Sequence, residues 1–586
     1  MKAAIGLRRL WGCVALVVLV TAGYAHPGAH GEIRVAPNVQ TEPLDVGTIP
    51  HIPDEEAVIL VVRVVDAGTG RVLPHRVRIT DAEGRYYPPE EHTELGELEG
   101  HVNNVTLEPD LINRGGRSWA MIEEGAFRAR LRAIDGYSIR VAHGLEYERP
   151  VFGLSLAGMA GKTVEKVFTL RRGIDMRARG WMSADSHVHS LSPEGALRQM
   201  RIEDVDYSNL MFFGPDHPLY TRGLVTGTPD PVSTSDRIVY VSQEVRDMNL
   251  GHMTLLGLQT PIEPVRLYTG TGKTEPEPKA NEPFNWEVTR RMHEQGGLAF
   301  HAHYLFWPGY GSAVGGALGL LDGLEWTSTD IVNSQRRTRQ GLRIHGWDIR
   351  PTGVDSGLLY YRMLNCGARL PLLGGTDKMS AARPVGSVSR TYAKVDEWSH
   401  DGFMEAVKEG ATFVTNGPLL DLTVDGRPMG SELTFAGDGP FKVTVNAKCF
   451  SQRPINYIQL IQNGEVIHEL REDDLPLENA FQFEARFEQS GWLALRAGHD
   501  ESNPEDWWGY PMAAHTSPIY VTIDDSLPAE EESARYLIAR LDATLIWAEQ
   551  GAIWSSPVSK QSAMEAFQEA RAFYEAALDR ARKNER

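Results

Sequence analysis

Short apolar runs alternate with amphipathic stretches through the middle of the chain. The runs are continuous, which is typical of strands buried on both faces. Helical patterns lie between them at residues 286–295, 358–365 and 402–409, and a glycine closely follows each one. Repeated strand and helix units predict a parallel sheet, and we expect a barrel over residues 173–418. The predicted strands are 210–213, 238–241, 298–300, 321–324 and 370–373.

The two flanks carry a different pattern, in which strand signals are separated by turn residues. Residues 57–65 and 76–80 predict strands on either side of a glycine-containing turn. They indicate an N-terminal β-sandwich with an extended lead-in over residues 26–172. A second β-sandwich is expected over residues 419–525. Its predicted strands are 420–424, 441–447, 457–462, 492–497 and 519–523.

The last segment, residues 526–586, has a helical pattern. Apolar side chains recur there at helical spacing, and we expect them to form a packing face rather than a ligand site. They are Met564, Phe567, Ala570, Tyr574 and Leu578.

The first residues have the order of a secretory signal, with a charged start, an apolar core and small residues before Ala25. We therefore expect residues 1–25 to be removed and the chain to be exported, with the periplasm favoured and an extracellular location as the alternative. The apolar core is too short for a permanent span, and no stable membrane insertion is expected.

Composition narrows the possible partners. The formal net charge of −19 argues against nucleic acid as a partner. Of the three cysteines, Cys13 lies in the signal, while Cys366 and Cys449 fall in different predicted domains. We expect two buried free thiols, with a disulfide as the alternative.

Residues 187–189 form a His-x-His pair just after an apolar and basic stretch, residues 168–181, that could place the pair at the end of a strand. Two histidines at i and i+2 of an extended strand point to the same side, so His187 and His189 can converge on one metal ion. The pair alone is a weak signal, because two histidines at this spacing are often ordinary surface or core residues.

Further potential ligands follow the predicted strands in order. Each has an ordinary explanation as a surface histidine, a solvated carboxylate or a helix cap. The carboxyl ends of parallel strands form one rim, however, so the ordered set favours a shared metal site. The residues are Asp216 and His217, Glu244, His252 at the start of an apolar run, His301 and His303, and Asp377.

This ordered set, with Gly374-Gly375-Thr376 before Asp377, resembles the PHP (polymerase and histidinol phosphatase) metallohydrolase superfamily. Residues 364–367 and 410–420 resemble its CehA/McbA type, which includes carbamate and aryl ester hydrolases. The resemblance implies a distorted (β/α)7 barrel. The expected fold is thus multidomain α/β plus β, with this barrel flanked by two β-sandwich domains and a C-terminal helical segment.

The resemblance also implies the roles of the ligands. One divalent metal would be held by His187, His189, Glu244 and Asp377, and Glu244 would bridge to a second ion held by His252 and His301. Members of the family typically use His217 on a third ion. Two ligands for that third ion are missing. Pro193-Glu194-Gly195 stand where a histidine is usual, and Met379 stands in place of the histidine of the usual Asp-x-His motif. We expect one or two ions, and a His and carboxylate set does not distinguish Zn, Mn, Fe, Co and Ni.

The expected function is hydrolysis of an ester, carbamate or amide-like bond by metal-bound hydroxide. Asp216 and His303 are candidates for moving protons. Lys378 can partly replace the missing third cation, so a phosphoesterase is one alternative. A non-catalytic binding protein with a structural metal is the other.

The substrate is expected to be a small molecule. Nearby aromatic side chains are candidates for lining an apolar pocket, which makes an aromatic substrate one option, although buried aromatics are usually core residues. The oligomeric state stays open. The aromatic residues are Tyr304, Trp307, Trp326 and Trp347.

Overall fold

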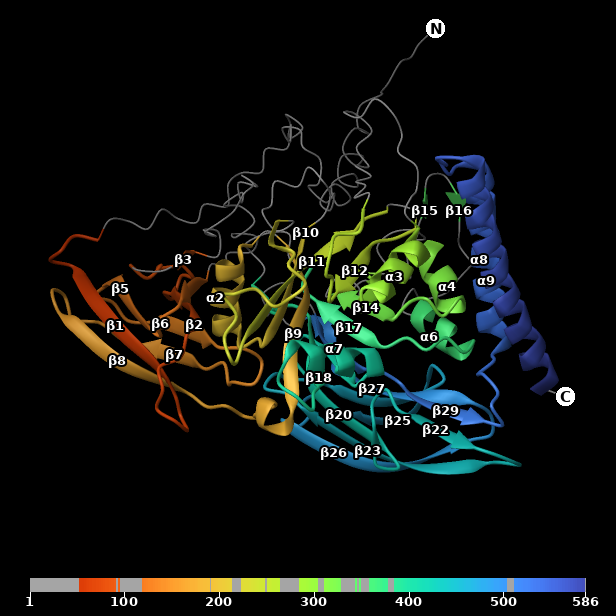
Figure 1. Cartoon of the computed structure of the whole chain (residues 1–586). Helices are drawn as coiled ribbons and strands as arrows, with labels where there is room; N and C mark the ends of the chain where they lie inside the picture. The colour runs from red at the N-terminus through yellow and green to blue at the C-terminus, as the bar shows by residue number, and fades with distance from the viewer. Residues whose placement is uncertain are drawn as a thin grey trace, which may run out of the picture.

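The chain is a mixed α/β protein built from several packed units, shown by a computed structural model (Figure 1). An N-terminal pair of sheets lies at one end, and two long helices lie at the other. The structure describes residues 52–90, 93–94, 119–189, 191–212, 223–247, 250–263, 284–303, 310–327, 343–344, 347–348, 358–377, 384–502 and 511–584.

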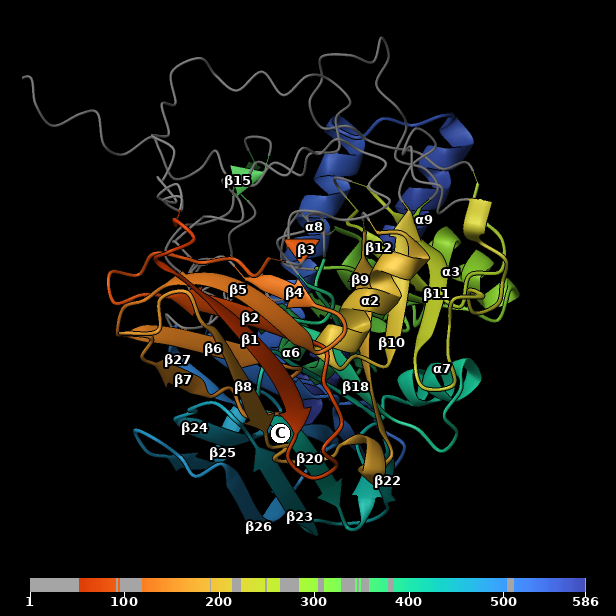
Figure 2. The same ribbon diagram turned by 90° about the vertical axis from the view of Figure 1, so that its left-hand side faces the viewer.

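The N-terminal unit consists of two sheets that share one apolar core. A three-stranded sheet has the order β5-β1-β8, and a five-stranded sheet has the order β3-β4-β2-β6-β7 (Figure 2). The strands predicted at 57–65 and 76–80 correspond to β1 and β2. The bounds are β1 (Ala57–Asp66), β2 (His75–Thr80), β3 (Thr93–Glu94), β4 (Ala120–Ile122), β5 (Ala126–Arg132), β6 (Tyr137–Ala142), β7 (Val151–Leu154) and β8 (Thr163–Leu170).

A central sheet follows, with the order β17-β14-β13-β12-β11-β10-β9-β18. Its pairings between β9, β10 and β11, and between β13, β14 and β17, are parallel. The bounds are β9 (Trp181–Val188), β10 (Tyr207–Phe212), β11 (Ile238–Val245), β12 (Met253–Leu256), β13 (Leu298–His301), β14 (Gly323–Thr327), β17 (Leu372–Gly375) and β18 (Arg390–Lys394), with a separate β15 (Arg343–Ile344) and β16 (Trp347–Asp348) pair.

The strand β12 runs antiparallel to both of its neighbours. The expectation of a sheet that is parallel throughout was therefore wrong. Parallel neighbours need a crossover of about a dozen residues or more, and the connection from Val245 to Met253 is too short to make one. The (β/α)7 barrel implied by the resemblance stays a prediction.

The two ends of the central sheet curve towards each other, because β17 packs beside β9. Hydrogen bonds join β17 to β9: the backbone N–H of Thr376, just after β17, donates to the Asp185 carboxylate of β9 at 2.9 Å. The Thr391 hydroxyl of β18 also donates to the carbonyl of Gly374 at 3.0 Å.

Helices lie between several of these strands, and local signals explain where they begin and end. Ser192 caps α2 by accepting from Gly195 N, and Pro193 occupies its first turn. The α7 helix begins after Ser399 and ends at Gly410, whose left-handed φ of 75° suits glycine. The bounds are η1 (Arg177–Arg179), α2 (Pro193–Glu203), α3 (Asn285–Glu294), α4 (Tyr310–Ala317), α6 (Leu358–Asn365), α7 (His400–Glu409), α8 (Glu531–Gln550) and α9 (Pro557–Asn584).

The C-terminal strands continue the central sheet, because β18 pairs with β19 and β19 pairs with β28. A separate sheet of order β21-β20-β23-β26 shares a core with this extension. The bounds are β19 (Thr412–Thr415), β20 (Leu419–Val424), β21 (Arg427–Pro428), β22 (Glu432–Phe435), β23 (Phe441–Phe450), β24 (Tyr457–Gln462), β25 (Glu465–Arg471), β26 (Glu478–Phe487), β27 (Gly491–Ser502), β28 (Pro511–Thr516) and β29 (Ile519–Ile523).

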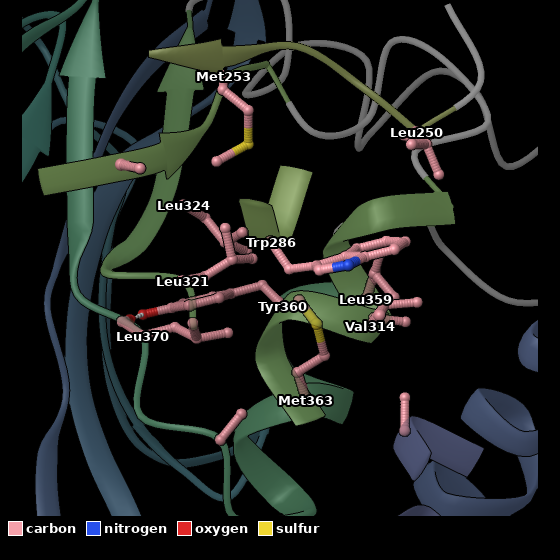
Figure 3. Close-up of a cluster of buried hydrophobic side chains, with 14 of the residues drawn as sticks. Leu250, Met253, Trp286, Val314, Leu321, Leu324, Leu359, Tyr360, Met363 and Leu370 are labelled. Atoms are coloured by element: carbon pink, nitrogen blue, oxygen red, sulfur yellow. Dashed lines mark hydrogen bonds between the residues drawn. The ribbon is translucent and has the colours of Figure 1, made fainter. Parts of the chain in front are cut away.

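The last two helices, α8 and α9, pack against each other and cover the α4 side of the central sheet. The apolar stripe predicted on α9 is a packing face: Phe567, Ala570 and Tyr574 are buried, and Met564 and Leu578 pack against the same core. Figure 3 shows part of this core around Trp286 and Tyr360.

Cys366 and Cys449 are both buried free thiols, as expected. Within the described segments, none of the helices has the length and apolar character needed to cross a membrane.

Candidate metal centre

His187 and His189 lie at the end of β9 with their rings turned towards each other. The Nδ1 of His187 donates to the Glu325 carboxylate at 2.6 Å, and the Nδ1 of His189 donates to the carbonyl of Met211 at 2.6 Å. The two Nε2 atoms face each other 3.0 Å apart, so either one shared proton lies between them or a cation that both atoms ligate takes its place. Histidine ligands bind a metal through one ring nitrogen while the other donates to a carboxylate or a carbonyl, as Nδ1 does in both rings here.

Two carboxylates complete this cluster. Asp377 Oδ1 lies 3.5 Å from His187 Nε2, and Glu244 Oε2 lies 3.1 Å from His189 Nε2. Two groups of side chains have ligand atoms close enough to hold an ion. They are His187, His189 and Asp377, and His187, Glu244 and His303.

Glycine allows the end of β17 to approach β9. A Cβ on Gly375 would lie 2.7 Å from the backbone N of His187 and 2.6 Å from its Cβ. Asp185 fixes the same junction by accepting hydrogen bonds from the backbone N–H groups of Thr376 and Gly386. These contacts bring Asp377 to the His-x-His pair although the two are far apart in sequence.

The antiparallel direction of β12 explains how His252 joins the site. His252 precedes β12, whereas the other described candidates lie at or just after the carboxyl ends of their strands, so a parallel β12 would place it at the opposite edge of the sheet. In the antiparallel arrangement, its Nδ1 lies 2.9 Å from Glu244 Oε1. Gly251 has a left-handed φ of 101°, and a Cβ there would collide with the His301 ring.

His301 and His303 take different positions. His303 Nε2 lies 3.4 Å from Glu244 Oε1, which places this expected proton carrier among the side chains that could hold an ion. His301 belongs to neither of the two groups found among the described residues. Its Nε2 donates to the carbonyl of Leu250 at 3.2 Å, and its buried Nδ1 has no hydrogen-bond partner in the described part of the chain. A nitrogen of this kind is available for a ligand or an ion.

The electrostatics of the cluster favour a bound cation. Burial lowers the pKa of His187, but the carboxylates of Glu325, Asp377 and Glu244 outweigh it and hold this pKa well above its usual value. Burial also raises the pKa of Glu244, yet Arg246, His187 and His252 outweigh that effect and hold it well below its usual value. The carboxylates around His187 favour a positive charge at its ring, and Glu244 stays negatively charged. Both effects favour a cation bound between them.

Three of the other histidines are held neutral, the state in which histidines bind metals. Burial lowers the pKa of His189, lowers that of His252 to about 3 and lowers that of His301 to about 4. For His303, burial acts in the same direction, but the hydrogen bond to Glu244 and the charge of Asp377 outweigh it and raise the pKa.

Two charged residues of the site, Glu325 and Arg246, were not predicted from the sequence. Glu325 ends the apolar run predicted at 321–324, and this is the same signal that identified Glu244. Arg246 is buried, and its Nε donates to Glu244 Oε2 at 2.5 Å. A basic residue two positions after a candidate ligand carries no recognisable sequence signal.

Some predicted residues lie outside the described part of the chain. They include the catalytic candidates Asp216 and Lys378 and the metal candidate His217, as well as Tyr304 and Trp307. The side chain of Trp347 is also not described. Trp326 packs against the central core, with its ring centroid 5.0 Å from that of His515.

Comparisons with known proteins give two distant structural likenesses. No protein-family profile and no curated protein matches the chain. The chain resembles PsfC from Pseudomonas syringae PB-5123, with 16% identity and a TM-score of 0.25, over 39% of this chain and 87% of that one. It also resembles a two-domain protein from Bacteroides vulgatus ATCC 8482 that contains a predicted PHP-like metal-dependent phosphoesterase, with 14% identity and a TM-score of 0.26, over 54% of this chain and 90% of that one. Likeness at this level carries no argument about function, which therefore rests on the side chains of the site.

Proposed function

We propose that the chain is an exported metal-dependent hydrolase of the PHP superfamily and of its CehA/McbA type, which cleaves an ester, carbamate or amide-like bond. One observation carries the proposal. His187 and His189 each donate Nδ1 to an acceptor, so that both Nε2 atoms face each other beside the carboxylates of Glu244 and Asp377.

The side chains divide into those that hold an ion and those that act beside it. His187, His189 and Asp377 would hold one divalent ion, and Glu244 with His303 would hold the same ion or a second one. A divalent cation in such a site lowers the pKa of water and polarises the scissile bond. If His303 does not ligate an ion, its Nε2, 3.4 Å from Glu244 Oε1, is the alternative position for a proton, and Asp216 and Lys378 stay candidates for proton transfer and charge stabilisation.

A phosphoesterase is the second candidate, and Arg246 favours it. A buried guanidinium beside the cluster adds a fixed positive charge, which a phosphate ester needs more than a neutral carbonyl substrate does. Its contact with Glu244 also leaves that carboxylate less negative towards an ion.

Metal analysis combined with a substrate screen tests both candidates. The purified protein is analysed for Zn, Mn, Fe, Co and Ni, and turnover is measured on aryl esters and on phosphomonoesters. In His187→Ala and Asp377→Ala we expect loss of the ion and a fall in turnover of roughly 100-fold or more.

His293→Ala is the matched control. This histidine lies on α3, is paired with Asp322 and is 41% exposed, so its loss is expected to leave metal content unchanged. Unchanged metal content and turnover in both site variants would overturn the assignment. A bound ion without turnover on either substrate class would favour the non-catalytic alternative.

A further inference from the structure

Glu325 is a fully buried carboxylate in the middle of β14. It accepts three hydrogen bonds from side chains. Ser186 Oγ donates to Oε1 at 2.7 Å, Thr254 Oγ1 donates to Oε2 at 2.8 Å, and His187 Nδ1 donates to Oε2 at 2.6 Å. The partners come from β9 and β12, so one carboxylate connects three strands of the central sheet.

A charge at this position costs folding free energy, because a carboxylate moved from water into the protein interior loses its hydration. The three hydrogen bonds, one of them from His187, offset that loss. An apolar residue such as the neighbouring Leu324 would fill a strand position in the core without the loss. The arrangement therefore suits a role beyond packing.

The carboxylate controls which nitrogen of His187 faces the cluster. Because Nδ1 donates to Glu325, Nε2 is the ring nitrogen that faces the cluster and can ligate an ion, and it lies 3.6 Å from Glu244 Oε1 and 3.5 Å from Asp377 Oδ1. A carboxylate on Nδ1 also makes Nε2 a stronger donor to a metal. Thr254 Oγ1 lies 3.2 Å from the same Nδ1 and limits rotation of the ring.

We propose that Glu325 is the positioning residue of the metal centre: held by Ser186 and Thr254, it fixes the tautomer and orientation of His187 and so sets the affinity for the ion. The inference rests on the proposed function, because it assumes that His187 is a metal ligand. Glu325 is not expected to touch substrate.

Affinity for Zn²⁺, measured on the full-length protein by competition with a chromophoric chelator, tests this role. Glu325→Gln keeps the size of the side chain and an oxygen acceptor but removes the negative charge. We expect its dissociation constant for Zn²⁺ to rise by roughly 10- to 100-fold. Glu409→Gln, at an exposed position on α7, is the control and is expected to leave the constant unchanged.

Thr254→Val is the second variant, and it tests the positioning role of Glu325 if Glu325→Gln does not fold. It replaces one hydroxyl that holds the carboxylate by a methyl group of similar shape, and we expect a smaller loss of affinity, of several-fold. Exchange of bound Zn²⁺ for free ion should be faster in both variants.

The outcomes separate this inference from the proposed function. If the unaltered protein binds Zn²⁺ and both variants bind it within about twofold of the same constant, Glu325 is not a positioning residue, and the metal site itself stands. If the unaltered protein binds no divalent ion, both proposals fail.

Discussion

Two residues of the metal centre have a backbone conformation that side chains other than glycine rarely adopt. His303 has a φ of 28° and Asp377 a φ of 47°, both in the left-handed region. Such residues cost about 1–3 kcal/mol each and persist only where the surrounding structure holds them. Both directly follow strands of the central sheet, so the strain lies at the candidate ligands.

Gly375 is the residue whose substitution should damage the centre most directly. In Gly375→Ala, the new Cβ would meet the backbone of His187, which cannot move without displacing β9. We expect a loss of about 1–3 kcal/mol in the free energy of unfolding and weaker binding of Zn²⁺. Chemical denaturation and chelator competition measure the two effects.

Gly153→Ala is the control for this substitution, because a Cβ there has nothing within 4 Å. Equal stability of the two variants would mean that β9 and β17 are not packed as closely as described.

His75 in β2 should make stability depend on pH. Burial lowers its pKa to about 4, and the nearby His143 adds to this effect. A folded-state pKa below the unfolded value of 6.5 means that the contribution of His75 is present above pH 6.5 and is lost as the pH falls towards 4. The loss amounts to about 3 kcal/mol.

Denaturation of the unaltered protein and of His75→Gln at pH 7.5 and pH 4.5 isolates this group. The stability difference between the two proteins should shrink at the lower pH, since glutamine does not titrate. A difference that is the same at both values would contradict the assignment.

At the scale of elements, many strands of the central sheet were predictable, because β10, β11, β13, β14 and β17 contain or overlap apolar runs. The β9 and β18 strands contain many polar residues and carry no such signal. The direction of β12 was not predictable from its apolar run, since apolar runs carry no direction. The short connection between β11 and β12 did indicate the direction, because so few residues can join only antiparallel neighbours in a hairpin. Glu325 follows its predicted strand as Glu244 does but was not included, and in the structure it lies inside β14, which extends to Thr327.

The sequence indicated that His187, His189, Glu244 and Asp377 lie near one another, and the structure brings them together, but the sequence did not indicate their geometry. Residues i and i+2 share a face only while a strand continues. The strand β13 ends at His301, so His303 turns towards Glu244 in a way that spacing could not reveal. The residues outside the described ranges stay predictions.

The α9 helix should contribute strongly to stability through its buried face. Phe567 is fully buried, with its ring edge-on to Trp286 of α3 and the centroids 5.6 Å apart. Phe567→Ala is expected to cost about 3–5 kcal/mol in the free energy of unfolding. The exposed neighbour Gln568→Ala should change it by less than about 0.5 kcal/mol. Similar midpoints for the two variants in a denaturant titration would show that α9 does not pack on α3.

At the scale of the molecule, the central sheet and the C-terminal strands form one hydrogen-bonded structure. The strand β19 pairs with β18 on one side and with β28 on the other. Phe413 of β19 stacks on Tyr392 of β18, and both belong to the apolar core shared with the C-terminal sheets. The two units should therefore unfold together.

Phe413→Ala tests this coupling by hydrogen exchange on the full-length protein. Removing a fully buried ring should cost about 3–5 kcal/mol and should accelerate exchange in β9 and in β27 to the same extent. Val167→Ala, at a residue 62% exposed on β8, is the control and should change neither strand. Faster exchange in only one of the two strands would mean that the units open independently.

The junction of β9 with β17 has a consequence for the order of folding. Asp185 and Thr376 are 191 positions apart in the chain, so bringing them together closes a very long loop. Hairpins such as β11 and β12 can form early, whereas this closure carries the entropy of the whole intervening segment and is expected late. An ion ligated by residues on both sides of this junction would then stabilise the closed native state. It would slow unfolding while leaving the rate of refolding nearly unchanged, so that removing it would shorten the lifetime of the native protein.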